Sequence, residues 1–135
     1  MSHRNIDKRF LFAGNATFTV SNPNGEHYTF RIRQPDENAP FFLSWLSGPD
    51  NEASYSYLGI LQREGGILLT RKSKAWRGDK VYKVAAWAIA IVQHDKPLPE
   101  GYMIKHAGKC GKCGRKLTTP ESIERGIGPE CIKYL

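Results

Sequence analysis

The three cysteines of this 135-residue chain all lie after position 109, and their spacing is typical of a metal site. Cys110 and Cys113 form a Cys-x2-Cys pair, and Cys131 follows after a loop long enough to return to them. Thiolates at this spacing bind tetrahedral structural zinc, and Gly111 and Gly114 let the turn tighten around the pair. The sequence therefore predicts one structural Zn²⁺ held by these cysteines.

Two histidines are candidates for the fourth zinc ligand. His106 lies four residues before Cys110, so that it would complete the second close pair of ligands that a tetrahedral site needs. Its rival is His94, which stands at the end of an expected helix. We expect His106 to be the fourth ligand.

The cysteines have other interpretations. Cys110 and Cys113 could be a redox pair, or all three cysteines could be ordinary thiols. A redox pair should open a helix after a strand of a parallel sheet, and no such element is predicted. A catalytic zinc needs an open position and a neighbouring acid or base. Glu130 is the nearest carboxylate, and an acid at a helix start commonly serves the helix dipole. We expect a closed site and no enzymatic activity; a metal-dependent hydrolase or nuclease is the alternative.

The net charge of +7 is concentrated in two segments. Residues 71–83 carry six cations and one anion, and residues 105–135 carry seven and three, whereas residues 10–70 carry three and six. Such patches suit nucleic-acid phosphates or an acidic protein. The candidate nucleic-acid contacts are Arg71, Lys72, Lys74, Trp76, Arg77, Lys112, Arg115 and Lys116.

Each patch also has an interpretation without a ligand. The first could be a solvated loop whose Trp76 tucks under the following helix, and the second could balance the negative charge of a zinc–thiolate centre. A further candidate is a stacking platform on a strand, although the ordinary interpretation, which we prefer, places its aromatic rings in the core or at the rim of a small sheet. Its members are Tyr55, Tyr57, Arg31 and Arg33.

The elements that position these residues follow from hydrophobic periodicity. Alternation of apolar and polar residues, interrupted by turns rich in Gly, Pro and Asn, predicts five strands joined by short connections, and therefore an antiparallel meander. The expected strands are 16–21, 27–33, 41–46, 54–62 and 67–72. Residues 80–92 have helical spacing and four alanines between 85 and 90, so one helix should cover a sheet face, with Asp79 at its N-cap.

Two prolines and a glycine in residues 95–101 predict a linker. We expect an α+β fold, with a sheet-and-helix body in residues 1–100 and a small treble-clef-like zinc module in residues 101–135. Helical turns at 119–125 and around Cys131 would bring that cysteine to the pair, with Tyr134 in place of the usual second ligand of the terminal helix.

The run from Gly108 to Cys131 has the pattern CxxCGRxLTxPxSIxxGxGPxC and resembles the signature of a family of small, uncharacterised phage and plasmid proteins. The stretches 13–20, 48–51 and 57–59 are similar to the front half of such proteins. The resemblance implies an origin in a mobile element and supports a metal role for the cysteines. It implies no particular activity.

Segment lengths limit the possible membrane spans and the expected location of the protein. The longest apolar stretch, Val84 to Val92, has nine residues, whereas a membrane span needs about 20. The first residues lack the apolar run of a signal peptide, so we expect a cytoplasmic location, in the host cell if a phage encodes the protein.

The expected function is non-enzymatic nucleic-acid binding, DNA being the expected ligand, without a small-molecule cofactor. The alternative is a module that inhibits or recruits an acidic host protein, with zinc purely structural.

Overall fold

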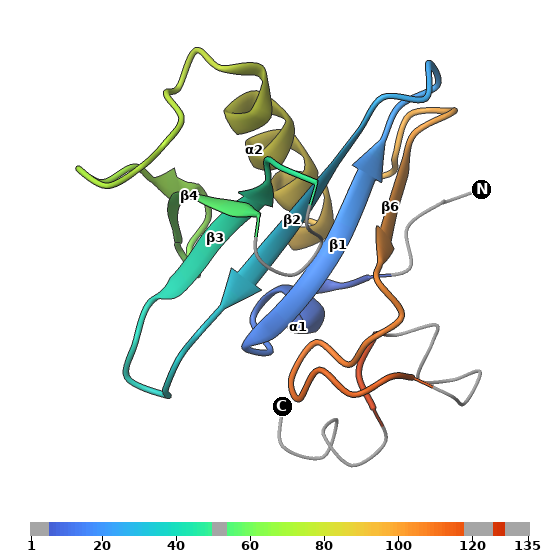
Figure 1. Ribbon diagram of the computed structural model, residues 1–135. Coiled ribbons are helices and arrows are strands. Elements are labelled where there is room, and N and C mark those ends of the chain that lie inside the picture. The colour runs from blue at the N-terminus through green and yellow to red at the C-terminus, as the bar shows by residue number, and fades with distance from the viewer. Residues whose placement is uncertain (1–5, 50–53, 118–125, 129–135) are drawn as a thin grey trace.

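The computed structural model describes residues 6–49, 54–117 and 126–128, which form an antiparallel sheet of six strands and two helices (Figure 1). The strand order is β5-β4-β3-β2-β1-β6. In chain order the elements are α1 (Lys8–Leu11), β1 (Asn15–Ser21), β2 (His27–Arg33), β3 (Phe41–Leu46), β4 (Tyr55–Leu61), β5 (Ile67–Leu68), α2 (Lys80–Gln93) and β6 (Met103–His106). The expected α+β class and the meander from β1 to β5 are confirmed.

The structure differs from the expected elements in three places. β5 stops at Leu68 instead of residue 72, because a turn begins where the Ser73 N–H donates to the Thr70 carbonyl. α1 is an additional single turn that Asp7 caps by accepting a hydrogen bond from the Phe10 N–H. β6 is an additional strand, which pairs antiparallel with β1. The boundary expected at residue 100 thus falls between α2 and β6.

One face of the sheet holds the core beneath α2 (Figure 1). Alternate residues of the central strands are buried on this side, and α2 meets them with alanine, valine and isoleucine side chains. The buried residues of this layer include Ala16, Phe18, Phe30, Ile32, Ala85, Ala88 and Ile89. Because side chains alternate along a strand, the intervening residues lie on the opposite face. No described helix covers that opposite face, which we call the open face.

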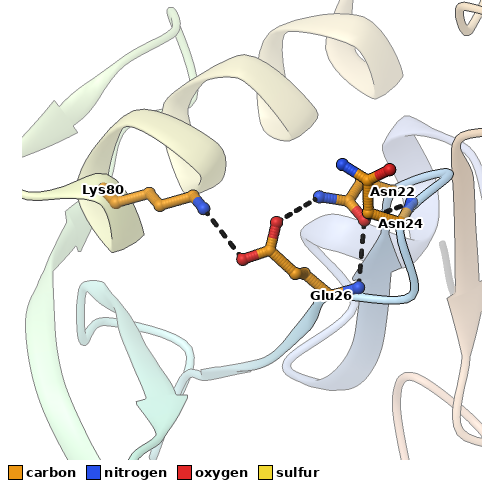
Figure 2. Close-up of polar contacts among 4 residues, drawn as sticks. All are labelled: Asn22, Asn24, Glu26 and Lys80. Carbon is orange, nitrogen blue, oxygen red and sulfur yellow. Dashed lines mark hydrogen bonds and ion pairs between the residues drawn. The ribbon is translucent and has the colours of Figure 1, made fainter.

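The start of α2 is tied to the turn between β1 and β2 (Figure 2). The Lys80 ammonium lies 3.1 Å from the Glu26 carboxylate, and the Asn22 amide donates to the other carboxylate oxygen at 3.0 Å. The hydrogen bond from Asn22 and then that from Lys80 lower the pKa of Glu26 below its ordinary value. Because the pair is exposed, it orients the helix start more than it stabilises the fold.

The described part of the tail packs onto the body through Phe10 of α1, whose side chain is fully buried. A methyl group added at Gly111 or Gly126 would come within 2.6 or 2.8 Å of the Phe10 ring. Leu117 and Ile127 are buried in the same core. Among the described residues, no helix has the length and apolar character that crossing a membrane requires.

We predict that Phe10→Ala lowers the free energy of unfolding by about 3–5 kcal/mol, since it removes a fully buried ring between tail and sheet. Urea unfolding followed by circular dichroism measures this change. Trp76→Ala is the control, because its side chain is 70% exposed and its loss should change stability by about 0.5 kcal/mol or less. A loss below about 1 kcal/mol for Phe10→Ala would contradict the packing described.

Candidate metal knuckle and nucleic-acid interface

Residues 108–117 form a tight hairpin, here called the knuckle, around the Cys-x2-Cys pair. The Leu117 N–H donates to the Gly108 carbonyl at 2.9 Å, and the Cys110 N–H donates to the Arg115 carbonyl at 2.8 Å. The Gly114 N–H closes the turn by donating to the Cys110 carbonyl at 2.9 Å. Gly114 has a φ of 79°, a left-handed conformation that glycine adopts without strain. The glycine beside Cys113 therefore has the tightening role expected from the sequence.

The sulfur of Cys110 is surrounded by backbone N–H groups. It accepts hydrogen bonds from Lys112 at 3.4 Å and from Gly128 at 3.3 Å. Burial of the thiol opposes its ionisation, but hydrogen bonds from the backbone N–H groups of Gly128, Cys113 and Lys112 and from the Cys113 side chain together outweigh burial and lower the pKa of Cys110 to about 7. Donors aimed at a sulfur stabilise the thiolate, which is the form that binds metals.

His106 lies against α1, with its ring centroid 5.9 Å from that of Phe10. Its Nδ1 accepts a hydrogen bond of 2.9 Å from the Gly108 N–H. In the neutral ring the proton is then on Nε2, so neither ring nitrogen is free to ligate a metal while this hydrogen bond is kept. This hydrogen bond therefore competes with a ligand role for His106. The rival, His94, is exposed and caps the C-terminus of α2.

The ligand set expected from the sequence extends beyond the described residues. Within them, Cys110 is buried and Cys113 is exposed, and no three potential ligands form a cluster. Cys131, Glu130 and the helical turns expected at 119–125 and near the C-terminus lie outside the part of the chain that the structure describes. Zinc binding by the four expected residues thus stays a prediction.

The first basic segment is a loop between β5 and α2, held by main-chain hydrogen bonds. The Lys74 N–H donates to the Tyr57 carbonyl of β4 at 2.8 Å, and the Trp76 N–H donates to the Asp79 carboxylate at 2.7 Å. Asp79 occupies the expected N-cap position of α2, but its side chain bonds to Trp76 and makes no capping hydrogen bond to the helix. The Trp76 side chain is 70% exposed, so it does not tuck under α2.

The open face carries polar, cationic and aromatic side chains. Strand register places Thr17, Arg31, Ser44 and Tyr57 in one row across β1 to β4. The guanidinium of Arg31 lies over the ring of Tyr55, 3.9 Å from its centroid. These side chains lie on the face opposite the core, so the structure excludes a place in the core. Tyr55 and Tyr57 are half-buried on that face, which fits rim aromatics as well as a platform.

Two cationic hollows flank the knuckle. The smaller, of about 280 Å³, lies between the open face and the knuckle. The larger, of about 450 Å³, lies between α1 and the knuckle. Among the described residues that line either hollow, none carries a carboxylate. The cations lining them are Arg31, Arg33 and Lys109 in the smaller hollow and Lys8, Arg9, Arg63 and Lys112 in the larger.

The two basic segments expected from the sequence are not brought together. Arg71, Lys72, Lys74 and Arg77 are exposed on the loop beside β4, whereas Lys112, Arg115 and Lys116 are exposed on the knuckle beside β1 (Figure 1). The open face lies between them. Sequence reasoning missed Lys8, Arg9 and Arg63 as neighbours of this surface. Arg31 and Arg33 had a signal, since they alternate with buried Phe30 and Ile32.

Comparison with known proteins gives a match in the tail. Residues 104–135 match a family of unknown function, DUF6011. This finding agrees with the resemblance of the tail to an uncharacterised family, and it covers less than half of the chain. No curated protein and no solved structure matches the chain.

We predict that the metal-free protein becomes more stable as the pH rises from about 7 to 9. The pKa of Cys110 is lowered from 9.0 to about 7 in the folded state, so its thiolate favours folding fully above the unfolded pKa. This contribution is lost as the pH falls through 7. Chemical unfolding across this range measures it, with Cys110→Ser as the comparison. Parallel pH profiles of the two proteins would contradict the assignment.

Proposed function

We propose that the protein is a non-enzymatic nucleic-acid-binding zinc protein that grips phosphates through its two basic segments. The observation that carries the proposal is Trp76, whose indole is 70% exposed within a loop of exposed cations. A large apolar ring left in water is unfavourable, and a base stacked on it would recover that cost. The neighbouring Arg71, Lys72, Lys74 and Arg77 supply positive charge for the adjoining phosphates.

The loop is suited to binding because its backbone is already fixed. Hydrogen bonds from the Lys74 and Trp76 N–H groups attach it to β4 and to Asp79. A segment ordered before binding loses less conformational entropy when a ligand arrives. The acidic residue of the loop is Asp79, and its carboxylate accepts a hydrogen bond from the Trp76 N–H within the turn.

The knuckle would provide the second set of phosphate contacts. Lys112, Arg115 and Lys116 are exposed on it, and Lys112 also lines the larger cationic hollow. Backbone contacts of this kind position a nucleic acid without reading its sequence. The proposed mechanism is electrostatic positioning with stacking by Trp76, and no catalytic step is involved.

The proposed zinc ion is structural and shapes the knuckle. Its ligands would be Cys110, Cys113, Cys131 and His106, in a treble-clef-like module. The N–H groups directed at Cys110 support thiolate ligation. Nδ1 of His106 already accepts a hydrogen bond from Gly108, so this residue would have to give up that bond to present a tautomer or a nitrogen that can ligate the metal, which makes it the weakest member of the set.

The resemblance of the tail to phage and plasmid proteins supports an origin in a mobile element and a place in the host cytoplasm. DNA is the proposed ligand on that basis. An acidic host protein is the other partner that the same cations would suit, because a basic surface attracts either polyanion. The experiments below separate these partners.

We predict one zinc per chain, measured by elemental analysis of the purified protein. Cys110→Ser should lose the metal, because a hydroxyl does not replace a thiolate at such a site. Lys116→Gln is the matched control and should retain it. His106→Ala tests the fourth ligand, and a full equivalent in this variant would remove His106 from the set. A full equivalent retained by Cys110→Ser would remove the zinc assignment itself.

We predict that affinity for DNA falls steeply with salt. If about five phosphates are neutralised, the plot of log affinity against log salt should have a slope near −4 to −5 for duplex and a smaller one for single strands. Fluorescence anisotropy at several salt concentrations measures the slope. Replacing Arg71 and Lys72 together by glutamine should reduce it by about 2, whereas Glu64→Gln, an acid outside the loop, should leave it unchanged.

If the protein binds none of duplex DNA, single-stranded DNA and RNA at low salt, the proposed function is overturned. Copurification with a stoichiometric host protein that nuclease treatment does not release would instead identify the alternative partner. Copurifying nucleic acid that salt removes, seen as a high ratio of absorbance at 260 to 280 nm, would support the proposal.

A further inference from the structure

A cleft of about 450 Å³ lies between α2, the β1–β2 turn and the loop before β6, and none of the candidate nucleic-acid contacts lines it. Its walls are mainly apolar or aromatic and include Val20, Tyr28, Val84, Trp87, Pro99 and Tyr102. We propose that this cleft binds a small aromatic anion, which is a ring carrying one carboxylate or phosphate group. The ring lies against Trp87 and Tyr102, and the acidic group meets the ammonium of Lys83. This inference goes beyond the proposed function and does not depend on it.

One face of α2 supplies both a cation and an aromatic wall of the cleft. Lys80, Lys83 and Trp87 follow one another at spacings of three and four residues, so their side chains share one stripe of the helix. Lys80 and Lys83 therefore face the cleft, although they belong to the basic segment 71–83. Because Lys83 and Trp87 are one helical turn apart, a small molecule can contact both side chains at once.

The charge of the cleft favours an anion. Both carboxylate oxygens of Glu26 are engaged, one by the Lys80 ammonium at 3.1 Å and the other by the Asn22 amide at 3.0 Å (Figure 2). The Lys83 ammonium, in contrast, forms no ion pair within the part of the chain that the structure describes. Since the charges of Glu26 and Lys80 offset each other, Lys83 leaves this lining with one positive charge. Beside an apolar wall, the attraction between this charge and an anion is stronger than in open water.

The aromatic rings of the cleft favour a ligand that is itself aromatic. The ring centroids of Trp87 and Tyr102 lie 5.1 Å apart, with 58° between the ring planes. Both rings are half-buried, so each keeps part of its surface open to the cleft, and Tyr28 of β2 adds a third half-buried ring. A ligand ring that covers these surfaces removes apolar area from water and gains tilted or offset ring contacts.

The walls of the cleft are held in place before a ligand arrives. Gly101 has a φ of 88°, and a methyl group there would lie 2.6 Å from the Pro23 side chain, so the loop before β6 packs directly on the β1–β2 turn. The Tyr102 N–H closes this loop by donating to the Pro99 carbonyl at 3.2 Å. The Lys80 ion pair connects the same turn to α2 (Figure 2). The volume also falls within the roughly 300–1,000 Å³ typical of small-ligand sites, and a preformed site loses little conformational entropy on binding.

Isothermal titration calorimetry with the purified full-length protein tests the cleft. The probes are naphthoate and adenosine monophosphate, each with a neutral counterpart, naphthylmethanol and adenosine. At least one anion should bind with a Kd below about 1 mM, and its neutral counterpart should bind about 5-fold more weakly because it lacks the charge. Binding of naphthoate supports a carboxylate ligand, and binding of adenosine monophosphate supports a phosphate ligand.

Charge variants should move the affinity for the anion in opposite directions. Lys83→Gln should weaken it about 5-fold, whereas Lys83→Arg keeps the charge and should bind as the wild type does. Glu26→Gln removes the carboxylate that neutralises Lys80 and should strengthen anion binding about 2-fold or more. None of these changes should alter the affinity for the neutral counterpart.

Ring variants test the aromatic wall. Tyr102→Leu should weaken binding of the anion about 5-fold, and Tyr102→Phe keeps the ring and should bind as the wild type does. Circular dichroism identifies variants that fold as the wild type does, and Lys83→Gln carries the test if Tyr102→Leu does not fold, because Lys83 is exposed. The proposal is overturned if neither anion binds below about 1 mM, if anions and neutral counterparts bind equally, or if the folded Lys83→Gln and Tyr102→Leu variants keep wild-type affinity.

Discussion

The contact between the Phe10 ring and the two glycines of the tail fixes the position of the knuckle on the sheet. Gly111 and Gly126 approach the ring so closely that neither has room for a methyl group. The Gly111 carbonyl also accepts a hydrogen bond from the Asn15 N–H at the start of β1. As a result, Lys109 of the knuckle lines the same hollow as Arg31 and Arg33 of the sheet. A knuckle attached by a flexible linker could not keep that arrangement.

The elements that sequence patterns predict well are those with many periodic residues. β1, β2 and α2 have alternation or helical spacing over seven or more residues, so local pattern and final burial agree. α1 and β6 have four residues each, and their structure depends on tertiary partners: Phe10 lies under the tail, and Ile104 pairs into the sheet beside Val20. No short window of sequence contains that information.

The candidate site also has local parts that the sequence predicts and non-local parts that it does not. The Cys-x2-Cys turn and the exposed loop around Trp76 are local features, and their spacing and composition predict them. The hollow is non-local, because β6 must pair with β1 before the knuckle stands beside β2. The tail also contains more packing than its few apolar residues suggest, since Leu117 and Ile127 join the main core. Zinc is therefore not needed as the tail's sole source of stability.

The hydrogen bonds to the Cys110 sulfur also bear on how the knuckle exchanges protons. With a pKa of about 7, this sulfur has already lost its proton in about half of the molecules at neutral pH. Uptake of the proposed metal at this position would then release less of a proton than uptake by an ordinary thiol. The backbone would thus lessen the competition between protons and metal at neutral pH, before any metal arrives.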